Sequence, residues 1–240
     1  MEIIILLAEG NTEKTLYTKL LKRFLNIEKS SYDELPIPIK DLMGSFEKKY
    51  IDIFIVENKL LVLLLNCRGY ERLRKYVKEI LESEYLIDAI KNGLNNLIIV
   101  ADMDKNPLNS MKGLFASIGF IPKIENYNLH INVNNHEIQI HIVEQGYQKE
   151  IEDDLEQLVR QVECKINKAI SIFEEKLGMK LSPKQRLGIY EAVLVDNNGL
   201  PQLIDLIIDK TDDQEIEKKL EKEMKVIKII KEILNHEKQA

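Results

Sequence analysis

The sequence predicts an α/β fold in which a mostly parallel sheet is flanked by helices and followed by a helical layer at the C-terminal end. Two apolar runs, residues 3–8 and 97–101, have the length and composition of buried strands, and acidic residues follow each of them directly. Amphipathic segments with a 3.6-residue period alternate with further strand-like runs over the first part of the chain. This alternation is typical of a parallel sheet covered by helices.

The chain begins with a predicted βα unit. A strand over residues 2–8 leads through a glycine turn into a helix over 12–25, where apolar residues recur at helical spacing. Residues 28–44 are polar, contain Pro36 and Pro38, and have no clear period. We expect them to form a long surface connection.

A hairpin and a second helix come next. Strand-like runs at residues 51–56 and 60–66 flank Glu57-Asn58-Lys59, which predicts a tight turn between an edge strand and a core strand. After Gly69, apolar residues at helical spacing continue through residues 73–81. They predict a helix that crosses back over the sheet.

The second apolar run is followed by another helix and another hairpin. The pattern over residues 108–118 is that of an amphipathic helix, and Gly119 is placed to end it. Residues 130–134 and 137–143 then predict two strands joined by a turn at the Asn134-Asn135 pair.

Beyond Gly146 the pattern is helical throughout. Apolar spacing over residues 151–177 predicts one long amphipathic helix. Ser182 followed by Pro183 is typical of a helix start, and we expect that helix to extend to residue 195. A short helix over 201–208 and a final charged helix from Thr211 complete the list.

This change of pattern predicts two parts, an α/β domain over residues 1–146 and a helical extension over 147–240. The chain has 240 residues, of which 45% are hydrophobic and 31% charged, enough for one large domain or two smaller ones with a proper core. Its net charge of −6 argues against a large sequence-independent contact with nucleic acid, which depends on Lys and Arg. A metal site could still bind a phosphate locally.

Composition also sets expectations about location. The N-terminal apolar run is short and lacks a basic flank and a small-residue cleavage site, and no stretch reaches the length of a membrane span. We therefore expect a soluble cytoplasmic protein with no membrane contact. Cys67 and Cys164 are far apart and the four histidines form no ligand pair, so neither a disulfide framework nor a zinc site is expected.

Two acidic fragments are the main functional signal. Glu9-Gly10 follows the first apolar run, and Asp102-Met103-Asp104 follows the second. Open α/β sheets bind ligands beyond the carboxyl ends of their strands, and convergent carboxylates there suit Mg²⁺. Each fragment alone has an ordinary explanation, because acids favour the positive end of a following helix. Glu9, Asp102 and Asp104 together predict a site for Mg²⁺ or Mn²⁺.

In their order and separation, these fragments resemble the Toprim domain of topoisomerases, bacterial primases and overcoming-lysogenization-defect nucleases. Glu9-Gly10 with Glu13 is similar to the glutamate–glycine turn of that family, and Asp102-x-Asp104 to its aspartate motif. Residues 60–66 with the following Cys67-Arg68-Gly69 resemble its second strand and glycine. The nearest likeness is to small, standalone, uncharacterised Toprim-like proteins of archaea and bacteria. In one departure, no glycine follows Asp104 closely.

The resemblance implies metal-dependent phosphodiester chemistry on nucleic acid. In that family the two aspartates hold the metal, and the equivalent of Glu9 acts as general acid or base or binds the metal. The positions that match these roles are Asp102, Asp104 and Glu9. No tyrosine can be assigned as a covalent nucleophile, so nuclease-type hydrolysis is expected rather than strand passage.

A second acidic cluster opens the predicted long helix. Glu152 and Asp153 lie in its first turn, where the helix dipole is sufficient to explain acidic residues. The alternative is that they add ligands for a two-metal arrangement. Both interpretations stay open, and these residues join the candidate metal ligands.

Phosphate contacts are expected beside the same crevice. Arg68, Arg72 and Lys75 lie at i, i+4 and i+7 on the helix after the second core strand. The alternative is a solvated helix face on which these residues pair with Glu71 and Glu79. The residues expected to bind phosphate are Gly10, Arg68, Gly69 and Arg72.

Two classes of function remain open. The first is an enzyme, a metal-dependent nuclease or phosphotransfer protein. The second is a non-catalytic binding or regulatory module that acts in a protein complex, which the acidic balance and the C-terminal helices favour; its partner would be another protein or a second copy of the chain. A sugar-nucleotide transferase that uses Asp102-x-Asp104 is a weaker alternative, because it leaves Glu9-Gly10 without a role.

Overall fold

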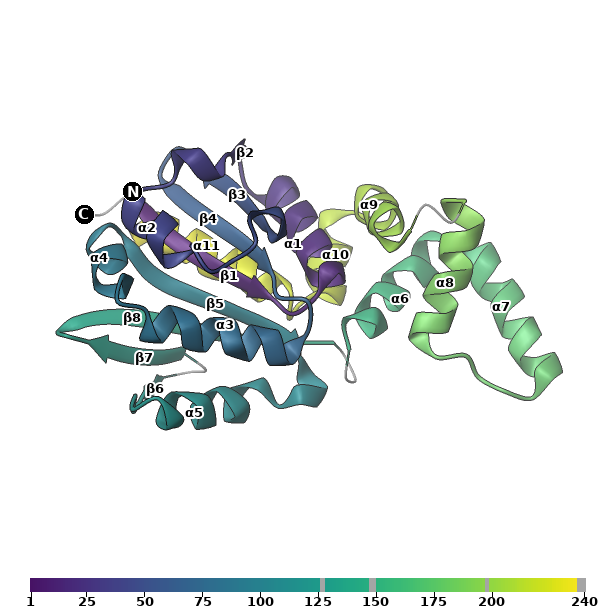
Figure 1. Cartoon of the computed structure of the whole chain (residues 1–240). Coiled ribbons are helices and arrows are strands. Elements are labelled where there is room, and N and C mark those ends of the chain that lie inside the picture. The colour runs from purple at the N-terminus through teal and green to yellow at the C-terminus, as the bar shows by residue number, and fades with distance from the viewer. Residues whose placement is uncertain (126–127, 147–149, 197–198, 237–240) are drawn as a thin grey trace.

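The computed structural model describes residues 1–125, 128–146, 150–196 and 199–236, which form one large sheet with helices on both faces (Figure 1). The sheet has eight strands in the order β2-β3-β4-β1-β5-β8-β7-β6. The strands are β1 Glu2–Ala8, β2 Ile27–Ser30, β3 Ile51–Val56, β4 Leu60–Asn66, β5 Leu94–Asp102, β6 Lys123–Glu125, β7 Asn128–Val133 and β8 His136–Gln145.

The helices follow the alternation that the sequence predicts. They are α1 Asn11–Phe24, α2 Ile37–Leu42, α3 Tyr70–Glu82, α4 Leu86–Lys91, α5 Pro107–Ser117, α6 Ile151–Val162, α7 Cys164–Leu177, α8 Pro183–Leu194, α9 Leu200–Lys210, α10 Asp213–Lys219 and α11 Met224–His236. Short 3-10 turns η1 Tyr32–Glu34, η2 Lys48–Tyr50 and η3 Met103–Lys105 lie between them.

The centre of the sheet is parallel, which confirms the predicted fold class. β1 pairs in parallel with β4 on one side and β5 on the other, and β5 pairs in parallel with β8. The register aligns Ala8 with Asn66 and with Val100, and Asp102 with Gln145. The carboxyl ends of these strands therefore meet at one edge, while antiparallel strands extend both sides of the sheet.

Alternating side chains of the central strands divide the core into two layers. Ile4 and Leu6 of β1 pack in a buried cluster with α1 and the helices from α6 to α11, whereas Ile5 and Leu7 pack with α2 to α5. β1 is apolar on both faces because helices cover both of them. Figure 1 shows α3 in front of the sheet, α5 below it and α11 behind it.

The C-terminal helices share a core with the sheet. α11 returns along the sheet and contributes Ile227 and Ile230 to the cluster that contains Ile4. α7 and α8 extend beyond the end of the sheet (Figure 1). The boundary expected after residue 146 falls beside residues 147–149, which lie outside the described residues.

Both predicted hairpins are present. Glu57 and Asn58 between β3 and β4 have φ of 50° and 56°, and Asn134 and Asn135 between β7 and β8 have φ of 49° and 68°. Two consecutive left-handed residues are typical of two-residue turns that match the twist of the strands. The predicted start of α8 is also confirmed, because the Ser182 hydroxyl accepts a hydrogen bond from the backbone N–H of Gln185.

Other local predictions were wrong. Residues 28–44 contain β2, η1 and α2 instead of a plain surface connection, and β2 rather than β3 is the edge strand. Leu35, Ile39 and Leu42 are buried there, an irregular set of apolar positions that has no sequence period.

The helix predicted over residues 151–177 is two helices. The chain turns at Glu163, whose φ and ψ are −123° and 60°, so that α7 leaves the direction of α6. The final helix is likewise divided into α10 and α11. Apolar periodicity continues across both turns, and the sequence pattern therefore did not reveal them. No helix in the described part of the chain has the length and apolarity that crossing a bilayer requires.

Candidate functional site

The ends of β1 and β5 bring Glu9 and Asp102 together. Glu9 Oε2 accepts a hydrogen bond of 3.3 Å from the backbone N–H of Asp102. Burial raises the pKa of Glu9, and this hydrogen bond and the nearby Lys105 oppose the rise. The two acidic fragments found in the sequence therefore lie side by side at one edge of the sheet.

Glu13 joins them from the first turn of α1 and is the most deeply buried acid of the group, with 5% of its surface exposed. A Cβ on Gly10 would lie 2.8 Å from Glu13 Oε2, so glycine leaves room for this carboxylate beside the β1–α1 turn. Burial raises the pKa of Glu13 to about 7, and the charges of Glu9 and Glu152 add to the rise.

Asp102 is the acid at the meeting point of three elements. Its Oδ1 accepts a hydrogen bond of 3.2 Å from the backbone N–H of Ile151, the first residue of α6. The pKa of Asp102 is raised to about 8. Burial is the largest cause, and the charges of Glu13 and Glu9 raise it further. These shared effects show that the carboxyls lie close enough to repel one another when ionised.

The other predicted ligands lie in different settings. Asp104 is in η3, exposed, and forms an ion pair of 2.7 Å with Lys105. Glu152 raises the pKa of Glu9, Glu13 and Asp102 through its charge, so it is near the group. Asp153 Oδ2 instead accepts a hydrogen bond of 3.2 Å from the backbone N–H of Glu150, which supports the helix-start interpretation for this residue.

The donor atoms fit a hard divalent cation, although their arrangement is not a finished ligand set. Carboxylate oxygens are the ligands that Mg²⁺ and Mn²⁺ prefer. Glu13 is buried and Glu9 and Asp102 are half-buried, and a cation would relieve the repulsion between these acids. Among the described residues, no group of three or more His, Cys, Asp or Glu side chains is placed to hold a metal ion as it stands. These side chains would have to rotate to bind one.

The β4–α3 turn contains two of the residues expected to bind phosphate. Arg68 has a left-handed backbone with φ of 58°, and Gly69, with φ of 117°, donates its N–H to Glu9 O at 2.7 Å. The Arg68 guanidinium donates to Tyr50 Oη at 2.8 Å and to Glu47 Oε1 at 3.1 Å. These protein partners already engage the Arg68 side chain.

The rest of the predicted basic stripe lies on an exposed helix face. Arg72 is exposed, while Lys75 pairs with Glu79 at 3.5 Å and Arg74 with Glu71 at 3.6 Å. These pairs favour the interpretation of the stripe as a solvated face. Gly10, the fourth residue expected to bind phosphate, lies at the start of α1 beside Glu13.

A buried polar network lies behind the carboxylates. Tyr17 Oη donates a hydrogen bond of 3.2 Å to Gln145 Oε1, and Glu223 Oε1 accepts one of 3.4 Å from the backbone N–H of Gly146. Burial and the neighbouring Asp154 raise the pKa of Glu223 to about 8. Sequence reasoning missed this network. Only Asp154 had a local signal, as part of the acidic run at the start of α6.

Glu13 was missed as a site residue although it had a signal. Its position three residues after Gly10 is part of the Toprim resemblance, and a carboxylate in the first turn of a helix next to Glu9 is placed to face the same crevice. The structure gives it a more buried place than Asp104.

Comparison with solved structures gives one relevant similarity. The fold matches the crystal structure of hypothetical protein PH0156 from Pyrococcus horikoshii OT3 with a TM-score of 0.72 and 17% identity, over 98% of this chain and 100% of that one. At this identity the similarity concerns the fold, including the C-terminal helices. No protein-family model matches the sequence, and no curated protein matches it.

Proposed function

We propose that this chain performs metal-dependent phosphodiester chemistry on nucleic acid, as a nuclease-type hydrolase of the cytoplasm. The observation that carries the proposal is the convergence of Glu9, Glu13 and Asp102 at the carboxyl ends of β1 and β5, buried enough to raise the pKa of all three. Acids with a raised pKa at the ligand-binding edge of an α/β sheet are typical of functional sites. The Toprim resemblance of the same residues supports it.

The residues have distinct roles in this proposal. Asp102 and Glu13 would hold Mg²⁺ or Mn²⁺, with Glu9, Glu152 and Asp104 as further oxygen donors at the rim. When bound, the metal would stabilise the charge that develops on the phosphate oxygens. Glu9, whose pKa burial raises, is positioned to take or give a proton, and its hydrogen bond from Asp102 keeps its carboxylate oriented.

Metal binding is the first test. Calorimetry with Mn²⁺ and Mg²⁺ should give saturable binding to wild type that is lost in Asp102→Asn. The matched control is Asp209→Asn, an equal loss of charge at an exposed position of α9, which should bind as wild type does. Because burial disfavours the charged form of Asp102, the Asn variant should fold at least as well as wild type, and thermal unfolding will check this.

Cleavage is the second test. Wild type with Mn²⁺ should cut at least one member of a panel of single- and double-stranded DNA and RNA, and Asp102→Asn should cut none. If wild type binds neither metal, even in the presence of an oligonucleotide that could complete the site, the proposal is wrong.

A second candidate function is a non-catalytic module that works in a protein complex, with another protein or a second copy as its partner. Large apolar side chains on α7, α8 and the segment between them are at least half exposed, namely Ile172, Phe173, Leu177, Met179 and Val193. Exposed apolar groups of this kind often mark contact surfaces. A partner that Asp102→Asn retains and Phe173→Ser loses, without metal-dependent cleavage by wild type, would favour this function over the enzyme.

A further inference from the structure

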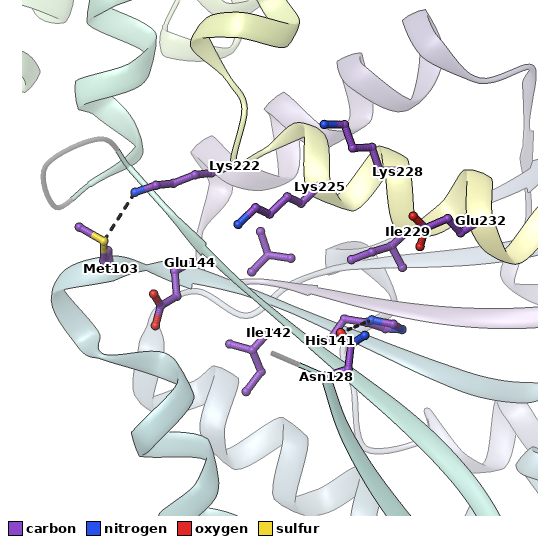
Figure 2. A pocket seen from close by; sticks show the side chains of 11 residues that line it. Met103, Asn128, His141, Ile142, Glu144, Lys222, Lys225, Lys228, Ile229 and Glu232 are labelled. Carbon is purple, nitrogen blue, oxygen red and sulfur yellow. Dashed lines mark hydrogen bonds between the residues drawn. The ribbon is translucent and has the colours of Figure 1, made fainter. Parts of the chain in front are cut away.

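A recess of about 390 Å³ lies between β8 and α11 and begins at the acidic turn after β5 (Figure 2). Met103, the residue between Asp102 and Asp104, lines one end of it. Lysines of the α11 segment line the opposite wall, which connects a basic surface to the candidate site. We call Lys222, Lys225 and Lys228 with this recess the lysine groove.

Lys222 connects the Met103 end of the groove to the candidate site. Its Nζ donates a hydrogen bond of 2.6 Å to Gly146 O and lies 3.5 Å from Met103 Sδ. The next residue, Glu223, accepts a hydrogen bond from the N–H of the same Gly146. Two consecutive side chains thus hold the end of β8, which places the start of α11 beside the Asp102-Met103-Asp104 turn.

Lys225 and Lys228 are the available cations of the groove. Both are exposed and lie three residues apart on α11, and within the described ranges neither ammonium group has an ion pair or hydrogen bond. Figure 2 shows Lys225 extending from α11 toward the Met103 end. Two unpaired lysines beside a recess are an anion-binding arrangement, because each ammonium is a compact charge with three donors.

The remaining charges of the groove leave it positive. Glu144 and Glu232 also line it, so the lysines outnumber the acids. His141 adds no charge near neutral pH, because burial lowers its pKa to about 4. A positive groove is notable in a chain with a net charge of −6.

We propose that the lysine groove binds the sugar–phosphate backbone of a single nucleic-acid strand and leads it to the carboxylate site. This inference rests on the proposed function and names its substrate class. Lys225 and Lys228 contact successive phosphates, and Lys222 holds the groove against the acidic turn. Repulsion between phosphates and the ionised carboxylates is offset at this point by the lysines.

The dimensions and lining of the groove favour one strand over a duplex. A volume of about 390 Å³ falls at the lower end of the range for small-molecule pockets, which suits a short stretch of one strand. None of the described residues that line it is Phe, Tyr or Trp, and the ring of His141 is buried, so bases have no exposed stacking platform. Contacts to phosphates alone predict binding that depends on salt and not on sequence.

The test is the affinity of a fluorescein-labelled twelve-residue oligothymidylate, measured by anisotropy with EDTA present so that no metal contributes. We expect Lys225→Glu/Lys228→Glu to bind about tenfold or more weakly than wild type, and the slope of log affinity against log salt to fall by about 1.4 for two lost contacts. The matched control is Lys165→Glu/Lys168→Glu, which makes the same charge change at the same spacing on exposed positions of α7. It should bind as wild type does.

Four results would contradict the inference. The groove is not the strand site if the two double variants bind alike, or if wild type does not bind the oligonucleotide. If inorganic phosphate or thymidine monophosphate competes as well as the oligonucleotide does, the groove binds a single phosphate group rather than a strand. If duplex DNA binds more tightly than the single strand, the preference for one strand is wrong.

The groove and the enzyme can fail separately. Binding in EDTA that the groove variant loses, without cleavage by wild type, would support the groove and contradict the proposed hydrolysis. Cleavage that Asp102→Asn abolishes, with equal oligonucleotide affinity in the groove and control variants, would support the proposed hydrolysis and contradict the groove.

Discussion

Glu9 and Asp102, 93 residues apart in the chain, are joined by a hydrogen bond of 3.3 Å from the Asp102 backbone N–H to Glu9 Oε2. The parallel pairing of β1 with β5 makes this contact, because it brings the two carboxyl ends side by side. The charge of Glu9 also raises the pKa of Asp102. Ionisation at the end of one strand is therefore linked to ionisation at the end of its neighbour.

Replacing Glu13 should weaken metal binding. Glu13→Gln keeps the shape of the side chain and removes a buried negative charge, so we expect the affinity for Mn²⁺ to fall roughly 10–100-fold, as for groups that support a metal site. The control is Glu221→Gln, an exposed position just before Lys222. Calorimetry at pH 8 checks the difference, and equal affinities in the two variants would remove Glu13 from the site.

Metal binding should become tighter as the pH rises from 6 to 8.5. Glu13 and Asp102, with pKa raised to about 7 and about 8, hold protons at the lower pH that a cation must displace. Calorimetry in buffers of different ionisation enthalpy should therefore detect proton release at pH 7. An affinity for Mn²⁺ that does not change over this range would contradict the raised pKa values.

The stability of the metal-free protein should depend on Glu223. Its pKa is about 8 in the folded protein against an ordinary value of 4.5, so the folded state keeps a proton that the unfolded state releases. The resulting stability is present below pH 4.5 and is lost as the pH rises toward 8. Glu223→Gln should be more stable than wild type at pH 8, by on the order of 1–3 kcal/mol.

Urea unfolding in EDTA between pH 5 and 8.5 will measure this effect. Wild type should lose stability over the range, and Glu223→Gln should lose less. Glu221→Gln, which changes an exposed acid two residues earlier, should follow the wild-type curve. Parallel curves for wild type and Glu223→Gln would contradict the assignment.

Arg186 should be essential for the packing of α6, α7 and α8. Its guanidinium bonds both carboxylate oxygens of Glu174 and lies 3.4 Å from Glu156 Oε1, and all three residues are buried. Arg186→Met leaves the buried Glu174 carboxylate without its ion-pair partner, which costs about 3–5 kcal/mol, whereas Glu156 keeps its ion pair with Arg160. Lys184→Met, at an exposed position of the same helix, should change stability by less than about 0.5 kcal/mol.

Hydrogen exchange will locate the Arg186 effect. Amides of α7 should exchange faster in Arg186→Met than in Lys184→Met, because Glu174 lies in α7. Unchanged exchange in α7 would mean that the ion cluster does not hold this helix in place.

The central sheet and the acids at its edge followed from the sequence. The short apolar runs that are followed by Glu9 and by Asp102 are local sequence patterns. Such a run is apolar at every position because helices bury both faces of the strand. The hairpin turns also followed from local residues, since Asn tolerates the left-handed backbone at Asn58 and Asn134. Breaks within helical periodicity, as at Glu163, had no such signal.

Within the site, the sequence determined which acids follow which strands, and the tertiary structure decided how each is used. Glu13 is buried whereas Asp104 is exposed. This difference in burial depends on neighbouring residues that come from other elements. The contact of Lys222 with Gly146, 76 residues earlier, required α11 to return to the end of β8. Periodicity fixes an element and its apolar face, but the partner of that face is chosen by packing among distant segments, for which the chain has no local pattern.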